Sequence, residues 1–117
     1  MRFSIAILLC GIFFVVHAKN RNDYFWGEIG LSDQVIFNKT VSKLGFLGLE
    51  VTKKFVFKQK NIIEALTITA IEIINMNKKN GATALIKSGG LGSKGVTIVF
   101  TSVRSKKIKD RVIIYGR

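Results

Sequence analysis

Apolar and polar residues alternate with a period of two along much of the chain, and this alternation predicts half-buried β-strands. The pattern is clearest in residues 35–42, 49–58 and 96–101, where polar or charged residues fill most of the intervening positions. A short apolar run from Val112 to Tyr115 follows near the end of the chain. The positions expected to face inward are Val35, Phe37, Val41, Leu49, Val51, Phe55, Phe57, Val96, Ile98 and Phe100.

The segment of residues 62–76 fits either a strand or a helix. Ile68 and Ala70 follow the strand period, but the apolar positions change parity at Ile71, as a β-bulge near Ala70 would produce. The apolar residues from Ile62 to Ile73 also fit the helical period of 3.6. Eight of the fifteen residues are Ile or Thr, whose β-branched side chains favour a strand. A strand with a bulge is the interpretation we prefer here.

Three polar or glycine-rich segments separate these stretches and predict hairpin turns. They are residues 77–81, which contain Asn80-Gly81, the glycine-rich residues 88–95, and the charged residues 105–110. A chain of 117 residues has room for one domain. Short strands at hairpin spacing then predict an all-β fold, as a single small antiparallel β-sandwich or open barrel.

Residues 1–18 have the features of a secretory signal peptide. Arg2 precedes twelve consecutive apolar residues, Ile5 to Val16, and Ala18 provides the small residue expected before a cleavage site. A membrane span needs roughly 20 apolar residues, so the run is too short to be a spanning helix. We therefore expect cleavage after Ala18, secretion, and a single domain formed by residues 19–117.

Cleavage would change the chemistry available to the domain. The full chain has 19 Lys and Arg against 7 Asp and Glu, a net charge of +12, and its single Cys10 and His17 both precede the cleavage site. The remaining 99 residues would carry a charge of +11 and no disulfide, thiol nucleophile, imidazole or zinc-thiolate site. We expect no enzyme activity, cofactor or metal, because the acidic residues lack motif spacing: Asp23, Glu28, Asp33, Glu50, Glu64, Glu72 and Asp110.

Residues 90–95, Gly-Leu-Gly-Ser-Lys-Gly, match the dinucleotide-binding pattern G-x-G-x-x-G. In that chemistry the last glycine opens a helix whose N-terminus holds the pyrophosphate. Here Val-Thr-Ile-Val-Phe-Thr follows Gly95, which predicts a strand. A glycine-rich hairpin loop is therefore the expected structure, without a nucleotide.

Asn38-Lys39-Thr40 is a sequon for N-glycosylation. The signal peptide would route the chain past the glycosylation machinery, and Asn38 and Thr40 fall on the expected polar face of their strand. Asn38 is therefore a candidate glycosylation site.

Basic residues gather in two groups, which we name as the candidate surface for an anionic partner: Lys53, Lys54, Lys58, Lys60, Lys106, Lys107, Lys109 and Arg111. An acidic protein, an acidic glycan, an anionic lipid surface and nucleic acid are the partner classes that positive charge attracts. Because Lys predominates over Arg, sequence-specific recognition of nucleic acid is not expected. A plain contribution to solubility is the alternative. Residues 106–109, Lys-Lys-Ile-Lys, also resemble a short nuclear-import signal.

Tyr24-Phe25-Trp26 is the aromatic cluster closest to the start of the domain. Such side chains can stack on sugars or bases, but near a strand end they more often fill the edge of the core. We expect the core role for this cluster, and also for Phe37, Phe55, Phe57 and Phe100.

Three motifs in the C-terminal part carry a family resemblance. They are Gly81-Ala82-x-Ala84-x-Ile86-x-x-Gly89-Gly90-x-Gly92, Val96-Thr97-Ile98-x-Phe100-x-Ser102-x-Arg104, and Val112-x-Ile114-Tyr115-Gly116. In this order and spacing they resemble the insect salivary-secreted-peptide family, which is also called the multiprotein bridging factor two, or transcription activator, family. The chain departs from it at Ser105-Lys106-Lys107, where members tend to have a glycine-bearing turn.

The resemblance implies two different functions. One is a secreted, non-catalytic binding protein, which agrees with the predicted signal peptide and is the interpretation the sequence favours. The alternative is a nuclear co-activator that bridges a sequence-specific DNA-binding factor to the general transcription machinery without binding DNA itself. The resemblance supplies no catalytic or binding residues.

Overall fold

The computed structural model describes residues 22–77 and 79–117, and the predicted signal peptide lies outside them. The described chain forms seven β-strands and no helix. The strands are β1 (Tyr24–Gly27), β2 (Gln34–Lys43), β3 (Thr52–Lys58), β4 (Ile68–Asn75), β5 (Thr83–Gly89), β6 (Gly95–Thr101) and β7 (Ile108–Gly116).

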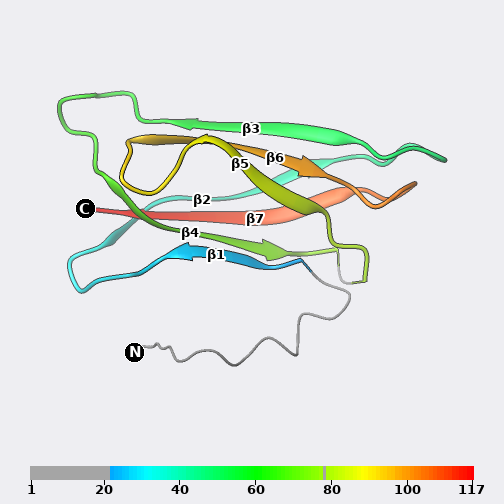
Figure 1. Cartoon of the computed structure of the whole chain (residues 1–117), viewed down its shortest axis with the longest axis horizontal. Helices are drawn as coiled ribbons and strands as arrows, with labels where there is room; N and C mark the ends of the chain where they lie inside the picture. The colour runs from blue at the N-terminus through cyan, green and yellow to red at the C-terminus, as the bar shows by residue number, and fades with distance from the viewer. Residues whose placement is uncertain (1–21, 78) are drawn as a thin grey trace.

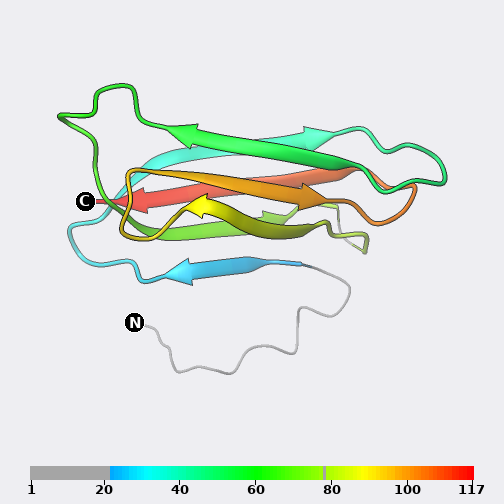
Figure 2. The same cartoon turned by 45° about the horizontal axis from the view of Figure 1, so that its top comes forward.

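The strands form two antiparallel sheets that pack face to face. One sheet has the order β1-β4-β7-β2 and the other has the order β3-β6-β5. In Figures 1 and 2 the strands of both sheets run along the long axis of the molecule, with connecting loops at the two ends. The all-β prediction is confirmed, and the structure is a sandwich of two separate sheets.

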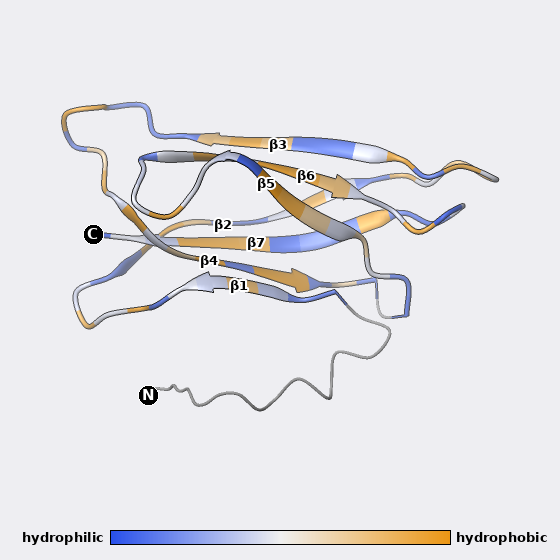
Figure 3. Ribbon diagram, viewed as in Figure 1, coloured by the Kyte–Doolittle hydropathy of each residue, from blue (hydrophilic) through white to orange (hydrophobic). Residues whose placement is uncertain are grey.

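The core lies between the sheets and is built from alternate residues of both. Its buried side chains form one cluster, and Figure 3 shows the hydrophobic positions along the strands that supply it. Phe37 contacts both Phe55 and Phe57, with ring centroids 5.2 and 5.5 Å apart. Full burial of each large apolar side chain contributes about 1.5–3 kcal/mol. The fully buried large apolar residues are Phe100, Ile68, Ile71, Ile73, Ile98, Ile108, Ile114 and Val112.

The ambiguous segment is a strand in its second half. Residues 68–75 form β4, and the register against β7 shifts between Ile68 and Ala70, as the predicted bulge requires. The bulge explains the change of parity, because Ile68 and Ile71 are then both buried. Residues 62–67 belong to the connection that precedes β4.

Two residues expected to face inward are exposed instead. The register of β2 against β7 shifts between Val35 and Phe37, so Ile36 packs against the core and Val35 is 54% exposed. Leu49, which is 52% exposed, precedes β3 and lies in the loop that leads to it. In both cases apolar and polar residues still alternate in the sequence where the regular register of the strand is interrupted or has not yet begun, so the alternation predicted an inward position wrongly.

Two of the three predicted hairpins are connections between the sheets. Residues 88–95 do join neighbouring strands, β5 and β6. Asn80 N donates to Asn77 O at 2.8 Å, as the expected turn requires, but this connection carries the chain from one sheet to the other. The β6–β7 connection also changes sheets. The turn residues specify where the chain reverses direction. Which strands pair is decided instead by the burial of the inner faces of the two sheets.

The last strand is longer than the sequence pattern indicated. Residues 108–110 were expected in a charged turn, but β7 begins at Ile108. The strand alternates buried and outward residues from its first position, and Ile108, Asp110 and Val112 are all buried. Because the residues between them are basic, this stretch resembles a charged turn in the sequence. The inward position of Asp110 was therefore missed.

Candidate binding surfaces

The first basic group lies along the edge strand β3. Lys54 and Lys58 alternate with the inward Phe55 and Phe57, which places both lysines on the outer face of the β3-β6-β5 sheet. Lys53 is also exposed, at the start of the strand, and the exposed Lys60 follows its end. Lysines on an edge strand also oppose unwanted pairing with another chain.

The second basic group is divided between a loop and the opposite face. The exposed Lys106 and Lys107 lie in the β6–β7 connection. Lys109 and Arg111 alternate with buried residues of β7, which places them on the outer face of the β1-β4-β7-β2 sheet. Lys58 of the first group is far from the loop residues of the second group, because it pairs with Gly95 at the opposite end of β6 from Thr101.

The eight residues therefore do not form one continuous surface. The structure brings Lys53, Lys54, Lys106 and Lys107 to one end of the sandwich, because Thr52 pairs with Thr101 at the end of β6. Lys109 is near the same end but on the outer face of the other sheet, whereas Lys58 and Lys60 lie at the opposite end. Their role in binding an anionic partner stays a prediction.

Asn38 lies on the outer face of β2 and is exposed, as is Thr40. Its side-chain Oδ1 accepts a hydrogen bond from Arg111 Nη1 at 2.6 Å, which leaves the amide nitrogen to be the glycan attachment atom. Exposure of the sequon is what a glycosyltransferase needs, and glycosylation itself stays a prediction.

Two of the three aromatic residues at 24–26 complete the edge of the core, and the prediction of a core role is wrong for Phe25. The rings of Tyr24 and Trp26 stack with centroids 5.4 Å apart and both pack against the buried cluster. Phe25 points the other way and is 51% exposed.

The glycine-rich segment forms a tight hairpin followed by a strand, as predicted. Gly90 N donates to Gly95 O at 3.0 Å, and Ser93 Oγ donates to the carbonyl of Gly90 at 2.7 Å. Gly89 has a positive φ of 70°, and a Cβ there would lie 2.2 Å from Gly95 O. The glycine at position 89 allows two backbone segments to approach closely. The segment after Gly95 is a strand, so no helix N-terminus lies there to hold a pyrophosphate.

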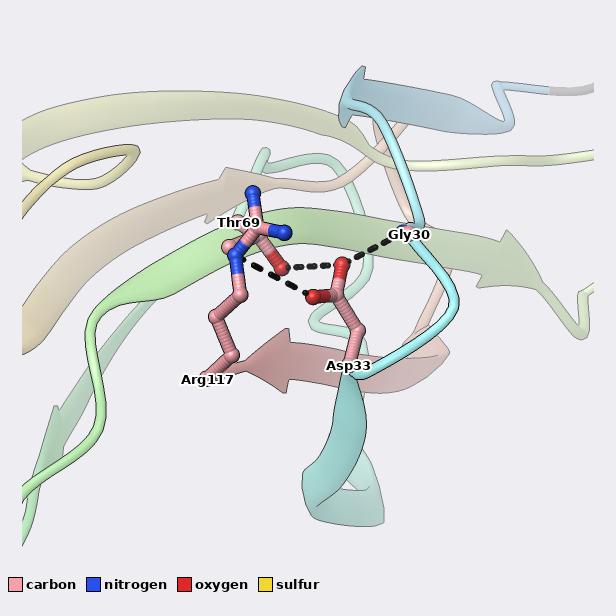
Figure 4. Close-up of polar contacts among 4 residues, drawn as sticks. All are labelled: Gly30, Asp33, Thr69 and Arg117. Atoms are coloured by element: carbon pink, nitrogen blue, oxygen red, sulfur yellow. Dashed lines mark hydrogen bonds and ion pairs between the residues drawn. The ribbon is translucent and has the colours of Figure 1, made fainter.

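Asp33 holds the β1–β2 loop against the end of the sandwich (Figure 4). Its side chain is fully buried, and Oδ2 accepts hydrogen bonds from Gly30 N at 2.6 Å and from Thr69 Oγ1 at 2.8 Å. Arg117 Nε lies 3.5 Å from Oδ1. Burial alone would raise the pKa of Asp33, but these hydrogen bonds and the Arg117 charge together lower it. The contacts describe a structural clamp.

Asp110 is a second buried carboxylate, and sequence reasoning missed it. It is 0% exposed, it pairs with Asn75 across the sheet, and neither carboxylate oxygen has a hydrogen-bond partner among the described residues. Burial, together with the charge of Asp23, raises its pKa to about 7. The sequence does place Asp110 in step with Ile108 and Val112, so the alternation could have indicated that its side chain faces inward.

The second missed feature is an exposed apolar loop. The β2–β3 connection contains four large apolar side chains in six residues, and their exposed fractions are 85%, 62%, 89% and 52% for Leu44, Phe46, Leu47 and Leu49. The sequence Leu-Gly-Phe-Leu-Gly-Leu, lying between Lys43 and Glu50, was the available signal. Alternation led us to assign Leu49 to the core.

In residues 22–77 and 79–117, no group of three or more His, Cys, Asp or Glu side chains could hold a metal ion. In the same part of the chain, no helix has the length and apolar character to cross a membrane.

Comparisons with known proteins place the whole described fold in one family. Searches of curated proteins and of solved structures each found no match. The family model described as transcription activator MBF2 matches residues 26–116, from within β1 to the end of β7. This supports the transcription-activator part of the resemblance, and nothing in the comparisons supports the salivary part. Because the match spans most of its length, the chain belongs to the transcription activator MBF2 family.

Proposed function

We propose that the chain is a non-catalytic transcription activator that works by binding proteins. The observation that carries this proposal is the family match over residues 26–116. In this role the domain bridges a sequence-specific DNA-binding factor and the general transcription machinery, and it makes no sequence-specific contact with DNA.

The distribution of charge supports a binding role. Positively charged side chains lie on the outer faces of both sheets, and such charges attract and orient acidic protein partners. The two buried carboxylates, Asp33 and Asp110, lie at opposite ends of the sandwich, because Asp33 contacts Arg117 after β7 whereas Asp110 is near the start of that strand. That separation argues against a catalytic carboxylate pair.

Recruitment to a promoter tests the proposal. The full chain is fused behind a heterologous DNA-binding domain, and transcription of a reporter carrying that domain's site is measured. We expect severalfold activation over the DNA-binding domain alone. In a mobility assay the free chain should show no preference for this DNA over unrelated DNA of the same length.

Two charge-reversal variants show which face contacts the partner. K54E/K58E alters the outer face of the β3-β6-β5 sheet, and K109E/R111E alters the outer face of the other sheet. We expect one of them to lower reporter activity while the other, as its matched control, leaves it unchanged. Absence of activation by the parent fusion would contradict the activator proposal itself.

A secreted binding protein is the second candidate, because two specific observations favour it. The N-terminal residues have the pattern of a signal peptide, and the sequon residue Asn38 is exposed on β2. The test is N-terminal sequencing of the native protein in culture medium, with a glycosidase treatment in parallel. A protein that begins at Lys19 and shifts in mobility on treatment supports secretion, and an intact Met1 terminus on intracellular protein contradicts it.

A further inference from the structure

The β2–β3 loop presents an exposed apolar tip at one end of the sandwich. We use the name apolar tip for the side chains of Leu44, Phe46, Leu47 and Leu49, which are between 52% and 89% exposed. Figures 1 and 2 show this loop projecting from the end of the sandwich at which β2 leads into β3 and β6 leads into β7. A cluster of large apolar side chains held out in solvent in this way marks an interaction site.

The apolar tip is held in place by the adjacent β6–β7 connection. Gly48 N donates to Ser105 Oγ at 2.7 Å, Ser105 N donates to Leu49 O at 2.8 Å, and Arg104 donates to Gly48 O. Leu49 N also donates to Phe46 O at 3.0 Å. These bonds satisfy backbone groups that would be costly to carry into an apolar medium. The loop is thus built to present its side chains while hiding part of its backbone.

Positive charges surround the apolar tip. We use the name basic collar for the exposed residues that flank it in sequence or in the neighbouring connection: Lys43, Lys53, Lys54, Arg104, Lys106 and Lys107. The backbone of Lys106 approaches closely enough that a Cβ on Gly45 would lie 2.7 Å from its carbonyl carbon. Glu50 is the acidic residue in the flanking segments 43–54 and 103–107. The collar therefore has a strong net positive charge.

We propose that the apolar tip and basic collar dock the protein on bilayers that contain anionic lipid. The tip would enter the headgroup layer, while the collar contacts the negatively charged surface around it. Apolar side chains and interfacial Lys or Arg are the two signals that together give stable interfacial binding. Each cation held near an anionic surface adds to the attraction, and salt screens it. This inference is independent of the proposed activator function.

The shape of the site favours a lipid surface over a protein partner. The apolar side chains project from a loop between two strands and all carry high exposure, which suits entry into a soft interface. Charge complementarity commits the proposal to anionic bilayers, because neutral lipid offers nothing to the collar. Binding of an acidic protein by the same tip is the competing outcome.

Vesicle flotation of the full chain tests the proposal. The probes are phosphatidylcholine vesicles with about 30% phosphatidylserine and, for comparison, pure phosphatidylcholine vesicles. We expect binding to the anionic vesicles that weakens as salt rises, and little binding to the neutral ones. L44S/L47S should reduce partitioning by about tenfold or more. K106E/K107E should reduce it by a similar factor.

Matched controls lie at the opposite end of the sandwich. Ile62 and Ile63 are 78% and 94% exposed in the β3–β4 connection, so I62S/I63S removes comparable apolar surface away from the tip. K87E/K94E reverses the charge of two exposed lysines near that end, beside the pairing of Gly89 with Val96. Both controls should bind like the parent. All the proteins share one N-terminus, so any contribution of the apolar run at residues 5–16 is common to them.

A fluorescent reporter distinguishes docking through the tip from attachment elsewhere. In W26F/L47W the one tryptophan is at the tip, and in W26F/I63W it is at the opposite end. We expect the emission to shift to shorter wavelength with anionic vesicles for L47W alone. Equal emission from both, or partitioning unchanged by the tip variants, would overturn the proposal. Tip-dependent binding to poly-glutamate without vesicle binding would also overturn it, in favour of an acidic protein partner.

Discussion

Single buried residues decide how the stability of this domain depends on pH. Asp110 is buried without a hydrogen-bond partner, and its pKa lies near 7 instead of the usual 3.8. The unfolded chain releases this proton near pH 4, whereas the folded chain holds it until about pH 7. Over that window the unfolded state therefore gains stability relative to the folded state as the pH rises.

We predict that the free energy of unfolding falls by about 3 kcal/mol between pH 4 and pH 7 and then levels off. Denaturant titrations at a series of pH values measure it. D110N should remove most of the fall. Glu72, whose pKa is also raised by burial, remains in the variant and contributes a smaller fall of the same sign. A pH profile that is identical in parent and variant would contradict the buried, unpartnered state of Asp110.

Asp33 should behave in the opposite way, because its pKa is lowered. Its contribution to stability is present above pH 4 and is lost as the pH falls through the lowered value. D33A should reduce the free energy of unfolding by about 2 kcal/mol at neutral pH, since the Gly30 amide and Thr69 hydroxyl lose their acceptor. R117A is the control and should cost less than about 0.5 kcal/mol, because Arg117 is mostly exposed. Equal losses in both variants would show that the ion pair, and not the hydrogen bonding, dominates.

At the scale of the elements, periodicity identified the strands and turn chemistry identified the reversals. The parity change at Ile71 predicted the β4 bulge, which the pairing with β7 confirms. The choice of partner strands was not accessible, because β2 pairs with β7 and β3 pairs with β6, and these partners are far apart in sequence. Asp110 was misplaced because a run of lysines masked the alternation, and the apolar tip was missed because Leu49 continued that alternation into a loop.

The β5–β6 hairpin requires glycine at position 89 for a steric reason that does not apply to Gly92 in the same loop. G89A should lower the free energy of unfolding by about 2–4 kcal/mol, because a Cβ would overlap the Gly95 carbonyl oxygen in a left-handed conformation. Gly92 has a similar φ of 84° but open space around it, so G92A should cost only about 1 kcal/mol. Thermal or denaturant unfolding compares the two. Equal effects would indicate that conformation alone, without the close contact, sets the requirement.

For the whole molecule, the fold separates basic residues that the sequence had grouped together. Lys54 and Lys58 lie on one outer face, and Lys109 and Arg111 lie on the other. A net charge of +12 on a chain of 117 residues still attracts any polyanion. Specific partners must therefore be recognised by one face or one end, and not by the total charge.

We predict that binding to an immobilised polyanion is strongly salt-dependent and is shared between the faces. K54E/K58E and K109E/R111E should each elute from a heparin column at lower salt than the parent, and the quadruple variant lower still. The two effects should be close to additive because the pairs are separated by the thickness of the sandwich. Retention that does not change with salt would contradict the electrostatic origin of binding.

The central claim is that this member of the activator family acts in transcription through protein contacts. Immunoprecipitation of the native chain from nuclear extract, with its partners identified by mass spectrometry, tests it most directly. We expect the chain to be present in the nuclear fraction and to co-precipitate with a DNA-binding factor and components of the general transcription machinery. Recovery of the protein exclusively from the medium, beginning at Lys19, would contradict it.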